Sequence, residues 1–313
     1  MPAMSAAHAP EITAPGVSPP DGLGAAPATP AAAALPESLL RRFDAPGPRY
    51  TSYPTADRFV DTFDEAQLQP ALRQRAQHGA GGAAQPLSVY VHIPFCASVC
   101  YYCACNKVIT RHHERAAEYL DALDAEIDAV VALAGRGQPV SQLHFGGGSP
   151  TFLSDAELAR VVASLRRAFA IDGDTEMSIE IDPRTVTPAR LEHFRRLGFN
   201  RLSFGVQDFD PAVQQAVHRI QSRESVAALM ESARALGFES TNVDLIYGLP
   251  KQTPESLRRT VEQVAELRPE RIALYSYAHL PQRFKPQRRI DSAALPPAAD
   301  KVTMLSHSIA GFV

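Results

Sequence analysis

All four cysteines of the chain lie within ten residues, at Cys96, Cys100, Cys103 and Cys105. The spacing CxxxCxxC in one short segment is of the iron–sulfur kind, whereas structural zinc usually takes two ligand pairs that lie farther apart. Three thiolates can hold three irons of a 4Fe–4S cluster and leave the fourth iron open to an outside ligand. We therefore expect cluster chemistry in a reducing compartment, with a zinc-stabilised structural protein as the alternative.

Three further features could bind a ligand. The run Gly146–Ser149 (Gly-Gly-Gly-Ser) lets backbone amides approach a bound molecule, although such a run is often only a turn. Glu180 lies in the apolar run SIEID, where a carboxylate needs a partner: a ligand ammonium or ribose, or an arginine of the chain itself. Arg219 offers a planar fork for a carboxylate, but the residues around it fit a surface arginine better. Cys105 is the spare thiol, either a small buried residue or part of a subfamily motif.

The elements that must position these residues alternate regularly. Strand-like runs cover 87–95, 141–147, 176–182, 201–207, 241–249 and 271–280, and helical patterns cover 114–133, 155–169, 188–197, 222–236 and 254–267. Ser154, Thr187 and Thr253 are expected to cap helices, and Gly198 and Gly237 to end them. Six βα units with short connections predict an α/β fold with a parallel sheet. An open (β/α)6 barrel fits best, and a doubly wound sheet is the alternative.

Polar and cysteine residues gather where these strands end. The cysteine segment follows the first strand and the glycine run follows the second. The later strands end in polar residues: Glu180, Asp182, Gln207, Asp208, Asp244, Tyr247, Tyr277 and His279. The carboxyl ends of parallel strands share one edge, which is where βα barrels keep their chemistry. The sequence therefore predicts one site at that edge.

The composition of the chain indicates its partners, its location and its division into segments. The chain of 313 residues has a net charge of −3 and 45% hydrophobic residues, so nothing in the balance indicates nucleic acid or a membrane as a partner. Neither a secretory signal nor an apolar run of the roughly 18–20 residues that a membrane helix needs is present. We expect a cytoplasmic monomer. It would have a disordered Ala/Pro-rich tail over 1–37, a segment packing on the barrel over 38–85 and the barrel over 86–290.

Several segments resemble a known family. They are GPRYTSYPTA, YVHIPFC, CNKVITR, LHFGGGSPT, IEIDPR, GFNRLSFGVQDF, TNVDLIYGLPKQTPES and YAHLP. Over residues 38–313 the chain is similar to the bacterial oxygen-independent coproporphyrinogen III oxidases, whose CxxxCxxC loop marks radical S-adenosylmethionine enzymes. The resemblance implies that Cys96, Cys100 and Cys103 hold a 4Fe–4S cluster.

The resemblance also implies two bound S-adenosylmethionine molecules. The first would lie against Tyr90, Tyr102, Gly147 and Glu180. The second would contact Gly148, Ser149, Gln207, Arg219, Asp244 and Ala278, which turns Arg219 from a surface residue into a ligand-binding one. Tyr102 replaces a frequent Phe and Ser149 a frequent Thr, and each keeps the needed shape or hydroxyl.

The implied activity is an oxidoreductase step of heme and porphyrin biosynthesis. A 5′-deoxyadenosyl radical made at the cluster would remove hydrogen from two propionates of coproporphyrinogen III, which become vinyl groups of protoporphyrinogen IX. The electron donor and acceptor are not identified by the sequence. The alternative is the related heme chaperone, which lacks the GPRYTSYPT segment and a cysteine at the position of Cys105.

The chain departs from the family in length. The family continues into a helical domain that covers the substrate, whereas this chain stops at Val313 after a helix expected over 298–310. We therefore expect residues 291–313 to begin a truncated C-terminal domain. The chain should then hold its cofactors without turning over the substrate.

Overall fold

The computed structural model describes residues 42, 55, 58–81 and 85–312, and for 77–81 it describes the backbone alone. All of them belong to one compact unit, Ala34–Val313. The tail expected over 1–37 lies outside the described residues. The helix start expected at 39–43 and the GPRYTSYPTA segment (47–56) also lie outside them, apart from Arg42 and Thr55.

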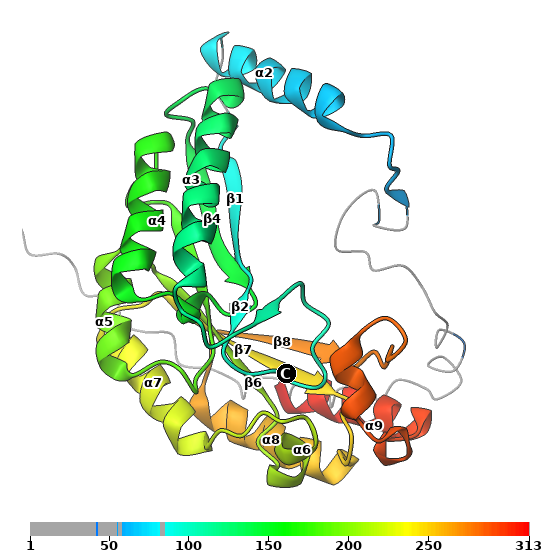
Figure 1. The fold of residues 1–313 in the computed structure, drawn as a ribbon. Helices are drawn as coiled ribbons and strands as arrows, with labels where there is room; N and C mark the ends of the chain where they lie inside the picture. Colours follow the sequence, from blue (N-terminus) through cyan, green and yellow to red (C-terminus); the bar gives the residue numbers. More distant parts are fainter. Residues whose placement is uncertain (1–41, 43–54, 56–57, 82–84, 313) are drawn as a thin grey trace, which may run out of the picture. The chain divides into compact units, whose positions relative to one another are not determined.

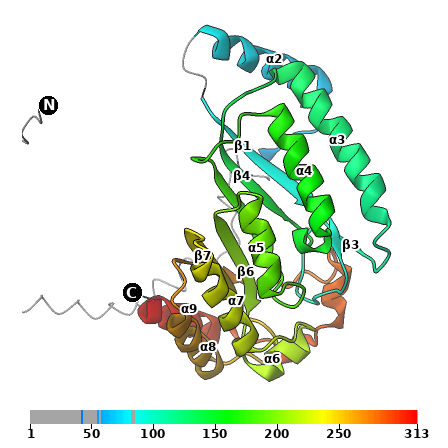
Figure 2. The same cartoon turned by 90° about the vertical axis from the view of Figure 1, so that its left-hand side faces the viewer.

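Six parallel strands form the main sheet, and they follow one another in chain order (Figures 1 and 2). They are β1 (Leu87–Ile93), β4 (Val140–Gly147), β5 (Glu176–Ile181), β6 (Arg201–Gln207), β7 (Ser240–Tyr247) and β8 (Arg271–Ser276). A doubly wound sheet reverses its strand order partway across, and this sheet does not. The open (β/α)6 arrangement predicted from the sequence is therefore confirmed.

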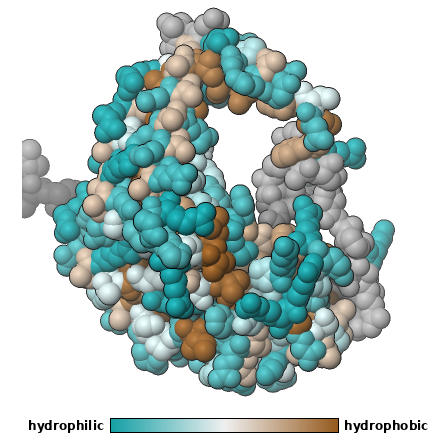
Figure 3. Space-filling view, viewed as in Figure 1, coloured by the Kyte–Doolittle hydropathy of each residue, from teal (hydrophilic) through white to brown (hydrophobic). Residues whose placement is uncertain are grey.

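Helices cover one face of the sheet. They are α3 (Arg115–Ala134), α4 (Asp155–Ala168), α5 (Pro188–Arg196), α7 (Arg223–Ala235) and α8 (Pro254–Leu267), and Figure 2 shows most of them in one row in front of the strands. The largest core cluster lies between the two layers. In it Phe145 of β4 meets Phe199 edge-to-face, with the ring centroids 5.2 Å apart. Hydrophilic side chains cover much of the outer side of α3 and α4 (Figure 3).

The predicted helix ends are confirmed with one exception. Ser154 and Thr253 each form a capping box with the residue three positions on, at the start of α4 and α8. Gly198 and Gly237 take positive φ angles of 99° and 74°, which let the chain turn out of α5 and α7. Thr187 occupies the expected cap position before Pro188 at the start of α5, but its side chain makes no capping hydrogen bond.

The sequence did not predict every element. Helix α2 (Glu65–Gly81) was missed because its polar sequence, with Pro70 inside, lacks a clear apolar face. Also missed were the short helix α6 (Pro211–Ala216), the two-residue strands β2 (Phe95–Cys96) and β3 (Val108–Ile109), and the 3₁₀ turns η2 (Pro150–Phe152), η3 (Lys285–Arg289) and η4 (Ser292–Ala294). Helix α9 (Ala298–Phe312) confirms the expected last helix and buries Met304 against Leu257 of α8. Among the described residues, no helix is long and apolar enough to cross a membrane.

Candidate active site

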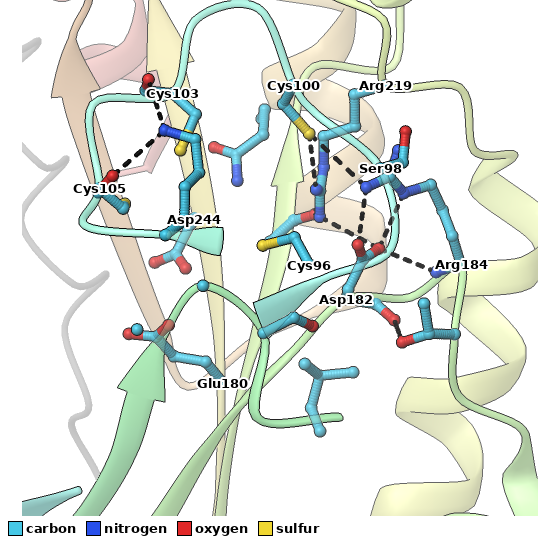
Figure 4. A pocket seen from close by; sticks show the side chains of 18 of the residues that line it. Cys96, Ser98, Cys100, Cys103, Cys105, Glu180, Asp182, Arg184, Arg219 and Asp244 are labelled. Atoms are coloured by element: carbon cyan, nitrogen blue, oxygen red, sulfur yellow. Dashed lines mark hydrogen bonds and ion pairs between the residues drawn. The ribbon is translucent and has the colours of Figure 1, made fainter. Parts of the chain in front are cut away.

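A cavity of about 490 Å³ lies at the carboxyl ends of the strands (Figure 4). Its volume falls within the range of small-molecule pockets, roughly 300–1,000 Å³. All four cysteines line it, together with the glycine run and side chains from β5, β6 and β7. The prediction of one site at this edge of the sheet therefore agrees with the structure.

The cysteine loop is held at both ends and in the middle. The parallel pair β2–β3 closes it, with Thr110 N donating to Cys96 O over 3.0 Å. Lys107 Nζ donates to the carbonyls of Cys103 and Cys105, each at 3.1 Å. The buried Gln287, in η3 beyond β8, donates to Tyr102 O at 2.9 Å. These bonds hold the backbone of the cysteine loop in place.

The protonation states of the cysteines differ. Burial, with the neighbouring Cys103 and Cys100, raises the pKa of Cys96 to about 12. The pKa of Cys103 falls to about 6, because a hydrogen bond from Cys105 and the nearby Lys107 ammonium favour the thiolate. The same hydrogen bond raises the pKa of Cys105, so Cys105 is the protonated donor of this pair. Ligands of iron must be deprotonated, and Cys103 is poised for that role at neutral pH.

The donor set fits a cluster. Cys96, Cys100 and Cys103 line one cavity and none is in a disulfide. In the described part of the chain, no three His, Cys, Asp or Glu side chains are grouped closely enough to hold a single metal ion. A Cβ on Gly148 would come within 3.0 Å of Cys96 Sγ and 2.8 Å of the carbonyl carbon of Pro94. Glycine is therefore required there, because the turn presses against the cysteine loop.

One side of the cavity carries charges that neutralise one another; we call Asp182, Arg184 and Arg219, around Cys100, the paired side. Arg184 binds the Asp182 carboxylate with two hydrogen bonds, of 2.9 Å and 2.7 Å. Arg219 is buried and donates to Gly205 O, to Asp182 Oδ1 at 3.4 Å and to Cys100 Sγ at 3.5 Å. Although burial opposes ionisation of Asp182, both arginines hold its pKa below the usual value.

The opposite side carries carboxylates without such partners; we call Glu180 and Asp244 the acidic side (Figure 4). Glu180 lies only 3.4 Å from a nitrogen of His144, and its side chain is 42% exposed to the cavity and solvent. Asp244 accepts hydrogen bonds from Asn242 at 2.8 Å and Ser203 at 3.2 Å, both neutral groups. Burial, supported by the charge of Glu180, raises the pKa of Asp244 to about 6.

Most residues that the sequence singled out line this cavity. They are Cys96, Cys100, Cys103, Tyr102, Gly147, Gly148, Ser149, Glu180, Gln207, Arg219 and Asp244. The exposed Tyr90 lies beside the cavity, where its ring comes within 2.9 Å of a Cβ built on Gly146. Ala278 is not a lining residue, and its carbonyl accepts a hydrogen bond from Gln287.

Some strand-end residues have other roles. Asp208 is buried and accepts hydrogen bonds from Thr260 at 2.7 Å and Gln252 at 2.5 Å, so it ties β6 to α8. Tyr277 and His279 hydrogen-bond to each other over 2.9 Å outside the cavity lining. The surface position expected for Arg219 from the residues alone is wrong, since the side chain is only 8% exposed.

Arg184 and Ser203 are lining residues that the sequence reasoning missed. Ser203 lies two positions before Gly205 on β6, with its side chain on the same face of the sheet as Asp244 of β7. Alternation along β6 could have identified Ser203. Arg184 lies three residues beyond the end of β5, and only the turn after β5 brings it back over the cavity.

Comparison with known proteins agrees with this geometry. The model of the Radical SAM superfamily matches residues 90–264, which include every cysteine and both sides of the cavity. The chain belongs to this superfamily, whose members bind a 4Fe–4S cluster and S-adenosylmethionine.

Individual relatives show which members of the superfamily the chain resembles. The chain is 48% identical to the "Oxygen-independent coproporphyrinogen III oxidase" of Escherichia coli and 50% identical to that of Pseudomonas aeruginosa, over 87% and 86% of its own length. It spans 58% of each relative. A solved structure titled "Coproporphyrinogen III oxidase (HemN) from Escherichia coli is a Radical SAM enzyme" superposes with a TM-score of 0.79, over 87% of this chain and 60% of the other.

Proposed function

We propose that the protein containing this chain oxidises coproporphyrinogen III to protoporphyrinogen IX without oxygen. One observation carries the proposal: three cysteines, a glycine turn and two unneutralised carboxylates line a single cavity in a chain about half identical to the oxidases named above. The heme chaperone is not favoured, because the relatives named above carry the oxidase name.

Cys96, Cys100 and Cys103 would hold the 4Fe–4S cluster. Cys103 is deprotonated at neutral pH, and the bonds from Lys107 and Gln287 keep the loop in place. When bound, the cluster and S-adenosylmethionine supply a 5′-deoxyadenosyl radical that removes a hydrogen atom from a substrate propionate. The propionate then loses carbon dioxide and one electron and becomes a vinyl group, so each of two propionates requires an outside electron acceptor.

The acidic side would bind the cationic part of S-adenosylmethionine. Glu180 and Asp244 bring two carboxylates to a partly buried cavity, and among the described residues no lysine or arginine forms an ion pair with either of them. A ligand that carries an ammonium and a sulfonium complements such a site, because it neutralises charges that the protein leaves open. Tyr90, Tyr102, Gly147 and Glu180 would contact the first molecule. Gly148, Ser149, Gln207, Arg219, Asp244 and Ala278 would contact a second.

The partners and location stay predictions. They are an unidentified electron donor and acceptor, a monomeric state and the cytoplasm.

The test is an anaerobic assay with reductant, excess S-adenosylmethionine and coproporphyrinogen III. It is run on this chain and on the complete open reading frame that contains it, each loaded with iron and sulfide. We expect protoporphyrinogen IX from the complete product and none from its Cys100→Ser variant. Reductive cleavage of S-adenosylmethionine with no change in coproporphyrinogen III would contradict the proposed substrate.

A further inference from the structure

Two arginines meet the sulfur of one cluster cysteine. Arg184 Nη2 lies 3.6 Å from Cys100 Sγ, and Arg219 Nη1 lies 3.5 Å from the same atom. Both distances lie within hydrogen-bonding range for sulfur. Figure 4 shows both guanidinium groups directed at this sulfur, on the side of the cavity away from Glu180 and Asp244.

Further hydrogen bonds and ion pairs hold the two arginines beside Cys100. Asp182 holds Arg184 through both carboxylate oxygens, and its Oδ1 also accepts from the Arg184 backbone N at 3.1 Å. The side chains of Asp182, Arg184 and Arg219 are 14%, 21% and 8% exposed. Solvent therefore screens their charges only weakly. The three groups together carry one net positive charge beside Cys100.

We propose that Arg184 is a positioning residue for the electron-transfer step, which raises the reduction potential of the cluster through its hydrogen bond to Cys100 Sγ. The inference rests on the cluster proposed above. Reduction adds one electron, and therefore one negative charge, to the cluster and its thiolates. Hydrogen bonds to cluster sulfurs and nearby positive charge stabilise that more negative state.

Arg184 differs from Arg219 in what else it does. Arg219 donates twice to Gly205 O of β6 and once to Asp182, so its loss would also disturb β6. The side-chain hydrogen bonds of Arg184 go to Asp182 and Cys100. Substitution of Arg184 therefore leaves the bonds between Arg219 and β6 in place.

The experiment is a redox titration of the iron-loaded chain, followed by electron paramagnetic resonance in the absence of substrate. Arg184→Gln should lower the equilibrium constant for one-electron reduction about tenfold, which is about 59 mV in midpoint potential. Arg184→Lys, which keeps the charge, should restore most of that loss. Arg258→Gln is the control, because Arg258 lies on the exposed side of α8 and pairs with Glu262.

Iron content separates the possible failures. Wild-type chain that holds no cluster would refute the proposed function itself. Arg184→Gln chain with full iron content and an unchanged midpoint potential would overturn the inference, and a lower melting temperature with that result would assign Arg184 a structural role. If neither Arg184→Gln nor Arg184→Lys retains iron, the residue serves cluster assembly and the inference is also overturned.

Discussion

The two sides of the cavity differ in whether the protein neutralises the charge of their carboxylates. On the paired side, Asp182 has two arginines, and its pKa is held below the usual value. On the acidic side, Asp244 has only neutral hydrogen-bond donors, and its pKa is raised to about 6. Buried charge without a partner costs folding free energy, so a protein keeps it where a ligand completes the site. On the paired side the protein itself neutralises the charges, and the acidic side is left for the cationic ligand that we propose.

The proposed cluster ligands give the largest expected effect, because both sides of the cavity flank the loop that carries them. Replacement of Cys96, Cys100 or Cys103 by Ala should reduce the iron content from about four per chain to below one after anaerobic reconstitution, since the remaining two thiolates cannot hold the cluster. Iron and sulfide analysis measures this. A variant at any of the three positions that keeps full iron content would remove that residue from the ligand set.

Substitution of Glu180 tests the acidic side directly. Glu180→Gln keeps the shape of the side chain but removes the negative charge, so the Kd for S-adenosylmethionine should rise at least tenfold, as expected for one charge-assisted hydrogen bond. Equilibrium binding to the anaerobic iron-loaded chain measures this. Glu192→Gln, on the exposed side of α5, is the matched control. An unchanged Kd together with a lower melting temperature would show that Glu180 serves the fold.

The unneutralised charge of Asp244 should make the stability of the folded chain depend on pH. Its pKa is about 6 in the folded chain and near 3.8 when unfolded, so the unfolded state favours ionisation. The contribution of Asp244 to the free energy of unfolding of the wild type therefore falls as the pH rises from about 4 to 6 and then stays constant. Asp244→Asn lacks this slope.

Asp244→Asn should therefore be less stable than the wild type near pH 4, because the amide satisfies Ser203 and Asn242 less well, and should recover relative to the wild type as the pH rises. The difference in free energy of unfolding should shift toward the variant by about 2 kcal/mol between pH 4 and pH 8, within the upper bound of roughly 3 kcal/mol that the full pKa shift implies. Urea unfolding of the ligand-free chain at pH 4, 5, 6 and 8 measures this. Equal destabilisation at every pH would show that Asp244 carries no charge penalty.

Cys105 gives the smallest expected effect on the metal. Cys105→Ala should leave the iron content unchanged, because the high pKa of this exposed thiol keeps it protonated. Reconstitution at pH 6 should become slower, since Cys103 loses the hydrogen bond that favours its thiolate. Loss of the cluster from Cys105→Ala with retention in Cys103→Ala would exchange the roles of the two residues.

The position of the site could be predicted from the sequence, and its internal pairing could not. Glu180, Gln207 and Asp244 lie late in strands that alternation identifies, and parallel strands bring their carboxyl ends to one edge. Nothing in that pattern distinguishes Glu180, which has a His144 nitrogen 3.4 Å away, from Asp182, which is held by two arginines. The difference depends on the turn after β5, which returns Arg184 to the cavity.

The same limit applies to Asp208 and Thr187. The strand pattern places Asp208 at the chemical edge, but contacts with Gln252 and Thr260 of distant segments make it structural. Thr187 stands directly before the Pro at the first position of α5, as a cap would, and its side chain nevertheless makes no capping bond. Local sequence predicts what a residue is able to do, and tertiary contacts decide which partner it finds.

The proposed cofactor site is tested most directly by the electron paramagnetic resonance spectrum of the reduced, iron-loaded chain with and without S-adenosylmethionine. We expect the cofactor to change the spectrum of wild type, because the fourth iron would be open and the acidic side would hold the ligand beside it. Glu180→Gln should show no change at the same cofactor concentration. A wild-type spectrum that is identical with and without S-adenosylmethionine would refute the proposed site.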